Sequence, residues 1–411
     1  MSDVIAEQHV WPADGNAAIP YWVYTSPAVY ARELERMWYG RHWLYCGLEA
    51  EVPEVGSYRT VTLGERPVVM VRSSDAQISV LENRCAHHGT KICWNRAGKV
   101  SDLVCPYHQW SYALDGRLQG VPFRRGVAGQ GGMPKDFDPA AIQLRSLKVE
   151  MANGVVWASF CDDTPPLKEY LGVAMWRFYT RLFSGRSLRV IGYNRQRIRG
   201  NWKLMLENNK DPYHAALLHV FFATFGLFRP DQKSALYMDD TGRHACLTSV
   251  MGDSDRSKIS GALPGFDGQL RLHDARLIQA VKELEGEETV AAITAFPSAI
   301  LLQQVNSLQV RTIVPRGHGE FDFVWTHFGF ADDDPEMADR RVRHANLFGP
   351  SGFVSVDDAE VIRMAQQGFA KTTDEAAIAL MGGRGIESAT NMATETAIRG
   401  MYAYYRQVMG L

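Results

Sequence analysis

Two pairs of cysteine and histidine residues in the first part of the chain have the spacing of metal ligands. Cys85 and His87 form a Cys-x-His pair, and Cys105 and His108 form a Cys-x-x-His pair. Two thiolates and two imidazoles suit a Rieske [2Fe–2S] cluster, in which cysteines hold one iron and histidines hold the other. Because neutral imidazoles leave such a cluster less negative than four thiolates do, it accepts an electron at a higher potential. This pattern predicts a one-electron carrier site.

A structural zinc site is the competing interpretation, because zinc also binds Cys and His at short spacings. Zinc sites favour a pair of closely spaced cysteines with a separate pair of histidines. Here each closely spaced pair contains one cysteine and one histidine. His88 is expected to support the site from behind or to lie at the surface, since neighbouring side chains of an extended segment point in opposite directions. The other cysteines are expected to be buried thiols; these are Cys46, Cys93, Cys161 and Cys246.

A second set of ligand types lies further along the chain. His214 and His219 occur in a segment predicted to be helical. A non-haem iron that binds dioxygen keeps coordination positions open, and two histidines with one carboxylate provide this. Five residues on an ideal helix place side chains about 140° apart, which is poor for one metal. We therefore expect a distortion between the two histidines, in the form of a π-type bulge.

Three acidic residues are candidates for the rest of this site. Asp211 lies one helical turn before His214, where it could accept a hydrogen bond from the non-ligating nitrogen or bridge to another metal site. Asp357 and Asp358 stand at the start of a predicted helix, where N-capping is the competing role. The two histidines could equally be core residues with satisfied nitrogens. The residues alone leave the third ligand open.

The composition fits a two-domain globular protein. The chain has 411 residues, of which 46% are hydrophobic and 22% are charged. The net charge of -2 provides no excess of positive charge that could bind nucleic acid. No apolar run is long enough to span a membrane. Six cysteines in a chain of this length do not indicate a disulfide framework. The N-terminus lacks the basic segment and apolar core that are typical of an export signal. A cytoplasmic location is expected.

The order of predicted elements indicates an α+β fold. A helix is expected at 27–40, and short strands with hairpin turns at Asp115-Gly116 and Asn153-Gly154 indicate a small antiparallel β domain. Acids and prolines at 162–166 mark a boundary. A larger domain follows, an antiparallel sheet flanked by helices. Its strands are expected at 188–199, 300–314 and 321–330, and its helices at 202–225, 335–346, 357–369 and 393–409.

The chain resembles the large (α) subunit of Rieske non-haem iron aromatic-ring hydroxylating oxygenases. The likeness runs from Pro20-Tyr21-Trp22 to the last helix and includes residues 120–126, 192–198, 321–330 and 345–350. The resemblance implies an N-terminal helical segment at 1–41 that packs with the catalytic domain, a Rieske domain at 42–163 and a catalytic non-haem iron domain at 164–411. It further implies a set of metal ligands: Cys85, His87, Cys105 and His108 for the cluster, and His214, His219 and Asp358 for the iron.

The resemblance also implies partners. Asp211 matches the family's bridging acid, which connects the iron's histidine to the cluster histidine of a neighbouring subunit. That arrangement needs a ring of three α chains, here with three small β chains. Electrons would come from a ferredoxin and an NAD(P)H-dependent ferredoxin reductase. At His88 many relatives carry arginine, so the hydrogen bonding of the cluster is expected to differ.

Two arginines are candidates for substrate binding. An aromatic carboxylate needs a cation or amide donors in an apolar pocket, and Arg311 and Arg399 match arginines of relatives with such substrates. A structural salt bridge is the competing role for each. The likeness is strongest to members that hydroxylate salicylate, which implies conversion of salicylate to gentisate (2,5-dihydroxybenzoate). The alternatives are a dioxygenase acting on anthranilate, a halobenzoate or terephthalate, an electron carrier with a non-catalytic second domain, and a zinc-stabilised binding protein.

Overall fold

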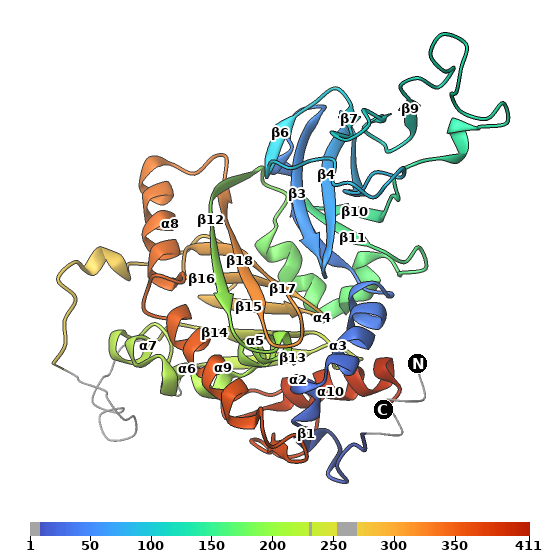
Figure 1. Ribbon diagram of the computed structural model, residues 1–411. Helices are drawn as coiled ribbons and strands as arrows, with labels where there is room; N and C mark the ends of the chain where they lie inside the picture. The colour runs from blue at the N-terminus through green and yellow to red at the C-terminus, as the bar shows by residue number, and fades with distance from the viewer. Residues whose placement is uncertain (1–8, 230–231, 253–268) are drawn as a thin grey trace. The chain divides into compact units, whose positions relative to one another are not determined.

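The computed structural model describes residues 9–229, 232–252 and 269–411 (Figure 1). The chain forms two compact units. The smaller covers Trp38–Thr164, and the larger combines the residues before Trp38 with Pro165–Leu411. Within the described ranges, none of the helices has the length and apolar character that a membrane crossing requires.

The smaller unit consists of antiparallel strands. A two-residue turn at Asn153-Gly154, with positive φ at both residues, joins β10 to β11 and confirms the predicted hairpin. The turn at Asp115-Gly116 likewise joins β8 to β9. Three sheets occur among the described residues: β5 (Gln77–Glu82), β4 (Arg66–Ser74), β3 (Ser57–Leu63) and β6 (Ala97–Lys99); β10 (Lys148–Ala152), β11 (Val155–Ser159) and β2 (Leu44–Leu48); and β7 (Leu103–Val104), β8 (Ser111–Tyr112) and β9 (Leu118–Gly120).

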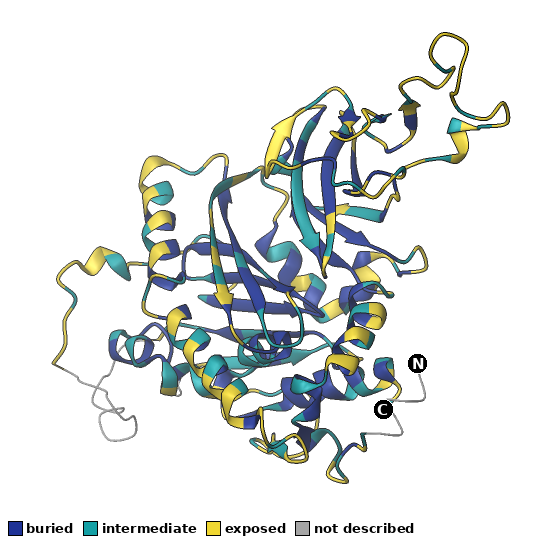
Figure 2. Cartoon of the chain, viewed as in Figure 1, coloured by how far each residue is buried: buried dark blue, intermediate teal, exposed yellow. Residues whose placement is uncertain are grey.

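A seven-stranded antiparallel sheet forms the centre of the larger unit's described part. Figure 2 shows its inner strands as largely buried, while the edge strand β12 alternates between exposed and covered positions. The strands follow the spatial order β12 (Leu188–Ile198), β18 (Phe321–Phe330), β17 (Ser307–Pro315), β16 (Ala299–Gln304), β15 (Val290–Ala295), β14 (Ala245–Ser249) and β13 (Ser234–Met238). A short pair, β1 (Ala18–Pro20) with β19 (Ala376–Ile378), lies outside this sheet.

The single strand predicted for 300–314 is wrong, because the chain turns back between β16 and β17. Val305 takes a positive φ of 55° at this turn. The side-chain amide of Asn306 donates to the backbone oxygen of Val281 and thereby fixes the turn (2.9 Å). A valine is rarely found at positive φ, so the turn signal of Asn306 and Ser307 was outweighed by the apolar residues before them.

Helices pack against this sheet and around it. The helix predicted for 27–40 ends earlier and passes into one π-helical turn, Leu34–Trp38. The described α-helices of this unit are α2 (Trp22–Thr25), α3 (Pro27–Glu33), α4 (Leu167–Leu182), α5 (Trp202–Lys210), α6 (Pro212–Leu218), α7 (Val220–Phe225), α8 (Pro335–Phe348), α9 (Ser355–Phe369) and α10 (Thr396–Met409).

A buried ion pair ties α5 to the two ends of the chain. Lys203 Nζ lies 2.6 Å from Glu33 Oε1, and both side chains are fully buried. The indole nitrogen of Trp202 and the hydroxyl of Tyr405 also donate to the Glu33 carboxylate, each at 2.7 Å. One carboxylate therefore connects α3, α5 and α10.

The Lys203→Met variant is expected to lose about 3–5 kcal/mol of stability, because the Glu33 carboxylate would stay buried without its cation. Urea unfolding at neutral pH measures this loss. The double variant with Glu33→Gln serves as the control and should recover part of it, since no buried charge is then left. A single variant as stable as the wild type would contradict this account of the pair.

Candidate functional site

The segment that carries His214 and His219 is broken twice, so the single helix predicted for 202–225 is wrong. The first break separates α5 from α6 at Asp211, whose φ of -97° and ψ of 102° are extended. Pro212 follows it, and a proline disfavours the helical conformation in the residue before it. The Asp211 carboxylate accepts a hydrogen bond from the backbone N–H of Tyr213 at 2.7 Å and thereby caps α6.

The second break falls at His219 itself, between α6 and α7. Its φ of -93° and ψ of 72° lie outside the helical region. The predicted distortion is confirmed, but its predicted form is wrong, because the chain leaves the helix instead of forming a π-type bulge. This break brings the rings of His214 and His219 to a centroid distance of 5.4 Å.

Asp358, in the first turn of α9, completes a group of three. Its Oδ1 lies 3.1 Å from Nε2 of His219 and 3.6 Å from Nε2 of His214. One ligand atom from each of the three residues lies within 4.8 Å of the others. The N-capping interpretation is wrong, because the N-cap of α9 is Val354 and no side chain makes a capping hydrogen bond there.

The electrostatics of this group suit a cation. Burial alone would raise the pKa of Asp358, but the two imidazoles hold it well below its usual range. Burial alone would lower the pKa of His214, but Asp211 and Asp358 raise it to about 10. The pocket thus stabilises positive charge between its nitrogens and its carboxylate. Two imidazoles and one carboxylate form the donor set that a mononuclear iron takes when it keeps open positions.

Polar groups around the three residues orient them. Asp211 Oδ2 lies 3.4 Å from Nδ1 of His214, and Asp357 Oδ2 lies 3.4 Å from Nδ1 of His219. Carboxylates behind metal-binding histidines fix their tautomer and ring orientation. The side-chain amide of Asn208 donates to Oδ1 of Asp358 at 3.0 Å. Sequence reasoning missed Asn208, because no spacing signal connects a residue of α5 to one of α9.

A cavity of about 90 Å³ opens beside His214, His219 and Asp358. One face of the central sheet forms its wall, since strand pairing puts Leu247, Ala292 and Leu302 in register. The lining is mainly apolar. The helices and loops contribute Asn208, Asn209, Asp211, Ala215, Phe222, Phe228 and Val354, and the sheet contributes Leu247, Val290, Ala292, Leu302, Gln304 and Arg311.

Arg311 supplies a buried cation to this cavity. Its Nε donates to the side-chain oxygen of Gln309 at 2.9 Å, and no carboxylate of the described residues lies within ion-pair distance of its guanidinium. Burial lowers its pKa to about 10, so it remains charged at neutral pH. Arg399 differs: its guanidinium donates to backbone oxygens of Ala379, Met381 and Gly385. The structure does not bring Arg399 to this cavity, and its contact with substrate stays a prediction.

The first set of ligand types lies on two loops of similar construction in the smaller unit. In each loop the carbonyl of the cysteine accepts a hydrogen bond from the residue four positions later, Gly89 after Cys85 and Gln109 after Cys105. Both of these residues have positive φ. The two loops therefore hold their cysteine and histidine side chains in the same arrangement.

The side chains of these loops converge. Both cysteines are buried, at 2% and 1% exposure for Cys85 and Cys105, while the rings of His87 and His108 lie 4.7 Å apart further out. The indole of Trp110 stacks on the His87 ring at 4.5 Å. Two inner thiols and two outer imidazoles match the donor set of a Rieske cluster.

His88 is exposed, which agrees with the predicted surface position, but its side chain does not point away from the site as predicted. Its ring lies 3.9 Å from that of His87, and one ring nitrogen each from His87, His88 and His108 lies within 4.8 Å of the others. The prediction assumed an extended segment, whereas the chain turns here, so consecutive side chains can share a side.

Comparison with known proteins identifies both units. Residues 42–130 match the Rieske [2Fe–2S] domain family, and residues 185–411 match the family "ring hydroxylating alpha subunit (catalytic domain)". The chain belongs to the Rieske ring-hydroxylating oxygenase alpha subunits. It is thus a Rieske non-haem iron oxygenase subunit with a [2Fe–2S] cluster and a His-His-Asp group that fits a mononuclear iron.

Curated members of this family align with the whole chain. The large oxygenase component of salicylate 5-hydroxylase from Ralstonia sp is 49% identical over 100% of this chain and 98% of its own length. The large subunit of anthranilate 1,2-dioxygenase from Burkholderia cepacia is 38% identical over 97% and 95%. The alpha 2 subunit of the terephthalate 1,2-dioxygenase oxygenase component from Comamonas sp is 38% identical over 97% and 97%.

Solved structures share the fold. Naphthalene 1,2-dioxygenase with indole in its active site superposes with a TM-score of 0.79, at 20% identity over 96% of this chain and 92% of that one. This agreement confirms the predicted α+β class, with small antiparallel sheets in the Rieske region and a large antiparallel sheet flanked by helices.

Proposed function

We propose that this oxygenase subunit hydroxylates salicylate at C5. One atom of dioxygen enters the ring to give 2,5-dihydroxybenzoate, and the other leaves as water with two electrons and two protons. The observation that carries the proposal is the buried guanidinium of Arg311 in the cavity beside the His-His-Asp group. The 49% identity to a salicylate 5-hydroxylase component supports the same substrate.

The cavity suits a small aromatic acid. A charge-assisted hydrogen bond from Arg311 would hold the carboxylate, and the apolar wall would hold the ring. A cavity of about 90 Å³ is small beside common ligand pockets of about 300–1,000 Å³, so it must open further to admit one ring and disfavours two. Phe222 and Phe228 line the cavity beside the metal group and would limit the access of water to the ring.

We assign the metal ligands by residue. Cys85, His87, Cys105 and His108 would hold the cluster, and His214, His219 and Asp358 would hold the iron. When bound, the cluster supplies single electrons and the iron activates dioxygen toward the ring. The Rieske domain would cover 42–163 and the catalytic domain 164–411. Of the segment 1–41, residues 9–37 belong to the same compact unit as the catalytic domain, and residues 1–8 lie outside the described part of the chain.

Asp211 would connect neighbouring subunits. Its carboxylate lies 3.4 Å from Nδ1 of His214 and keeps 19% of its side chain exposed, so a second group can reach it. We propose that this group is the cluster histidine of an adjacent copy in a ring of three α chains with three small β chains. A ferredoxin and an NAD(P)H-dependent ferredoxin reductase would supply the electrons.

Arg311→Gln is expected to raise the KM for salicylate by about 10- to 150-fold, because one charge-assisted hydrogen bond is worth about 1.5–3 kcal/mol. Steady-state kinetics measure this change. Phenol, which has no carboxylate, is the matched control, and its slow conversion should be the same in both proteins. An unchanged KM for salicylate would remove Arg311 from the substrate site.

The proposed reaction is tested by product analysis. The purified subunit with its small subunit, a ferredoxin and a reductase should convert salicylate to 2,5-dihydroxybenzoate with one labelled oxygen from ¹⁸O₂. Anthranilate and terephthalate, the substrates named for the 38% identical relatives, should react at least about tenfold more slowly. A diol from either as the main product would refute salicylate hydroxylation.

Tyr112 should raise the potential of the cluster. Its hydroxyl accepts from the N–H of Ala86 at 3.1 Å, which leaves its own hydrogen for Cys85 Sγ at 3.2 Å. Burial raises its pKa, so the hydroxyl stays protonated. Tyr112→Phe should lower the midpoint potential by about 60–130 mV, the equivalent of about 1.5–3 kcal/mol for one electron.

Spectroelectrochemical titration of the cluster measures this potential. Tyr58→Phe in the same hydrophobic core is the matched control and should leave the potential unchanged. Equal potentials in the wild type and Tyr112→Phe would mean that the hydroxyl does not donate to the cysteine.

A further inference from the structure

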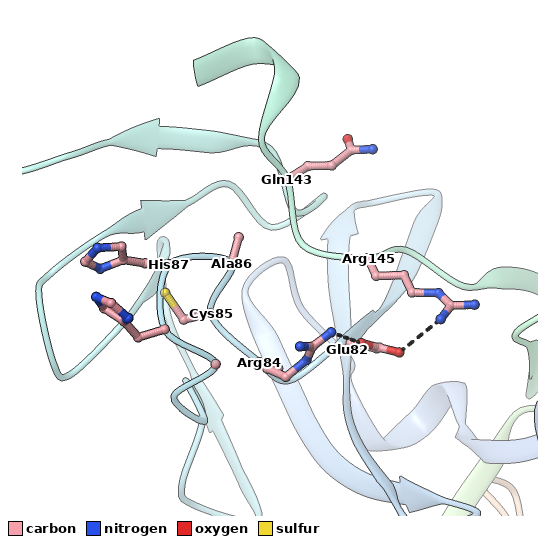
Figure 3. A pocket seen from close by; sticks show the side chains of 9 residues that line it. Glu82, Arg84, Cys85, Ala86, His87, Gln143 and Arg145 are labelled. Carbon is pink, nitrogen blue, oxygen red and sulfur yellow. Dashed lines mark hydrogen bonds and ion pairs between the residues drawn. The ribbon is translucent and has the colours of Figure 1, made fainter. Parts of the chain in front are cut away.

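A groove of about 450 Å³ lies beside Cys85 and His87 in the smaller unit. One side is formed by Glu82, the last residue of β5, and by residues 84–89 of the loop that follows it, and the other side carries Gln143 and Arg145 (Figure 3). The described residues that line it all belong to the smaller unit. A buried thiol and a half-buried imidazole of the proposed cluster site therefore border one open depression.

The charge of this groove is unbalanced. Arg66, Arg84 and Arg145 all contact the single carboxylate of Glu82, at 3.3, 3.1 and 3.4 Å. Glu82 is the only carboxylate of the described residues within ion-pair distance of any of the three. Of these three arginines only Arg84 and Arg145 line the groove, so its lining holds two cations and one anion, a formal excess of one positive charge.

The excess charge faces the solvent. The side chain of Glu82 is only 6% exposed, whereas those of Arg84 and Arg145 are 63% and 49% exposed. Figure 3 shows both guanidinium groups drawn to the same buried carboxylate. Glu82 thus holds the arginines in place without cancelling their field. Preorganised groups lose less side-chain entropy when a partner binds.

We propose that this groove is the docking site of an acidic one-electron carrier protein, which donates to the cluster beside Cys85 and His87. The inference rests on the electron relay of the proposed function. In each encounter the reduced carrier loses one electron and the cluster gains one, so charge is balanced without a further reactant. Transient redox complexes are small and depend on complementary charge for fast association, which fits an arginine-rich groove.

The test uses the complete oxygenase with its small subunit and an acidic [2Fe–2S] ferredoxin that reduces the wild type. Stopped-flow absorbance follows reduction of the cluster at low and high salt. Arg84→Glu and Arg145→Glu should each lower the second-order rate constant at least about tenfold at low salt and weaken its salt dependence. Arg84→Lys should stay within about twofold, because it keeps the charge.

Two controls separate docking from damage. Arg125→Glu makes the same change in charge at an exposed residue outside the groove, and its rate should equal that of the wild type. Photoreduced deazaflavin, a small reductant that needs no docking site, should reduce all variants equally. Unchanged rates with ferredoxin in Arg84→Glu and Arg145→Glu would overturn the proposal.

Other outcomes are equally decisive. If both variants disrupt the assembly in analytical ultracentrifugation, the groove is a contact between copies of this chain and the proposal fails. If neither ferredoxin nor deazaflavin reduces a cluster in the wild type, the relay itself is refuted, and the docking site with it. Slower reduction by deazaflavin in the variants would assign the arginines to the cluster's own stability instead.

Discussion

Asp358→Ala should leave the two cluster irons in place, remove the mononuclear iron and lower turnover by more than about a hundredfold. The carboxylate is the only anionic member of the donor set, and both histidine Nε2 atoms lie within 3.6 Å of its Oδ1. Without it, two neutral imidazoles would hold a divalent ion weakly. Iron analysis with the visible spectrum measures both effects on one preparation.

Asp357→Ala is the matched control, since it removes the adjacent acid on the same helix. Among the described residues, the Asp357 side chain contacts the outer nitrogen of His219, at 3.4 Å, and none of the other metal-binding residues, so its loss should weaken iron binding by at most about 10- to 100-fold. Iron retained in full by Asp358→Ala would show that the third ligand is another group.

Asp211→Asn should retain the cluster and the iron but transfer electrons between them about a hundredfold more slowly. The carboxylate sits behind His214 with part of its surface open, as a link between sites requires. Loss of a carboxylate behind a metal-binding histidine costs about 10- to 100-fold in activity. Rapid mixing of the reduced protein with salicylate and dioxygen, followed through reoxidation of the cluster, measures the transfer.

A mixed assembly distinguishes a link between subunits from a local effect on His214. One chain carries Asp358→Ala and an intact cluster, and the other carries Cys105→Ala and an intact iron group. Separately tagged chains that assemble together should regain product formation if electrons cross between copies. Mixed assemblies as inactive as both parents would place the transfer within one chain.

Local constraints made much of this molecule predictable. The Cys-x-His and Cys-x-x-His hooks are short enough that spacing alone restricts what they can bind. Strand β18 matches its predicted range, 321–330, because large apolar residues recur along its whole length, from Phe321 to Phe330. Pro212 carried a signal for the break in the predicted helix 202–225, since proline restricts the residue before it.

Contacts between segments that are distant in sequence were harder to predict. Asp358 lies far from His214 in sequence, so only the packing of α9 could select it over other acids. Arg311 and Arg399 carry the same charge and are both buried, yet one faces the cavity and the other binds backbone oxygens. The direction of the His88 side chain was misjudged because alternation applies to strands, and its segment turns.

One chain is expected to carry a Rieske cluster and a catalytic iron that together hydroxylate a small aromatic acid. Metal analysis, the visible spectrum and NADH-dependent conversion of salicylate, measured on a single purified complex, test it directly. We expect two cluster irons and one further iron per chain, Rieske absorbance and 2,5-dihydroxybenzoate as product. A colourless zinc protein, or a cluster protein without the further iron and without turnover, would contradict it.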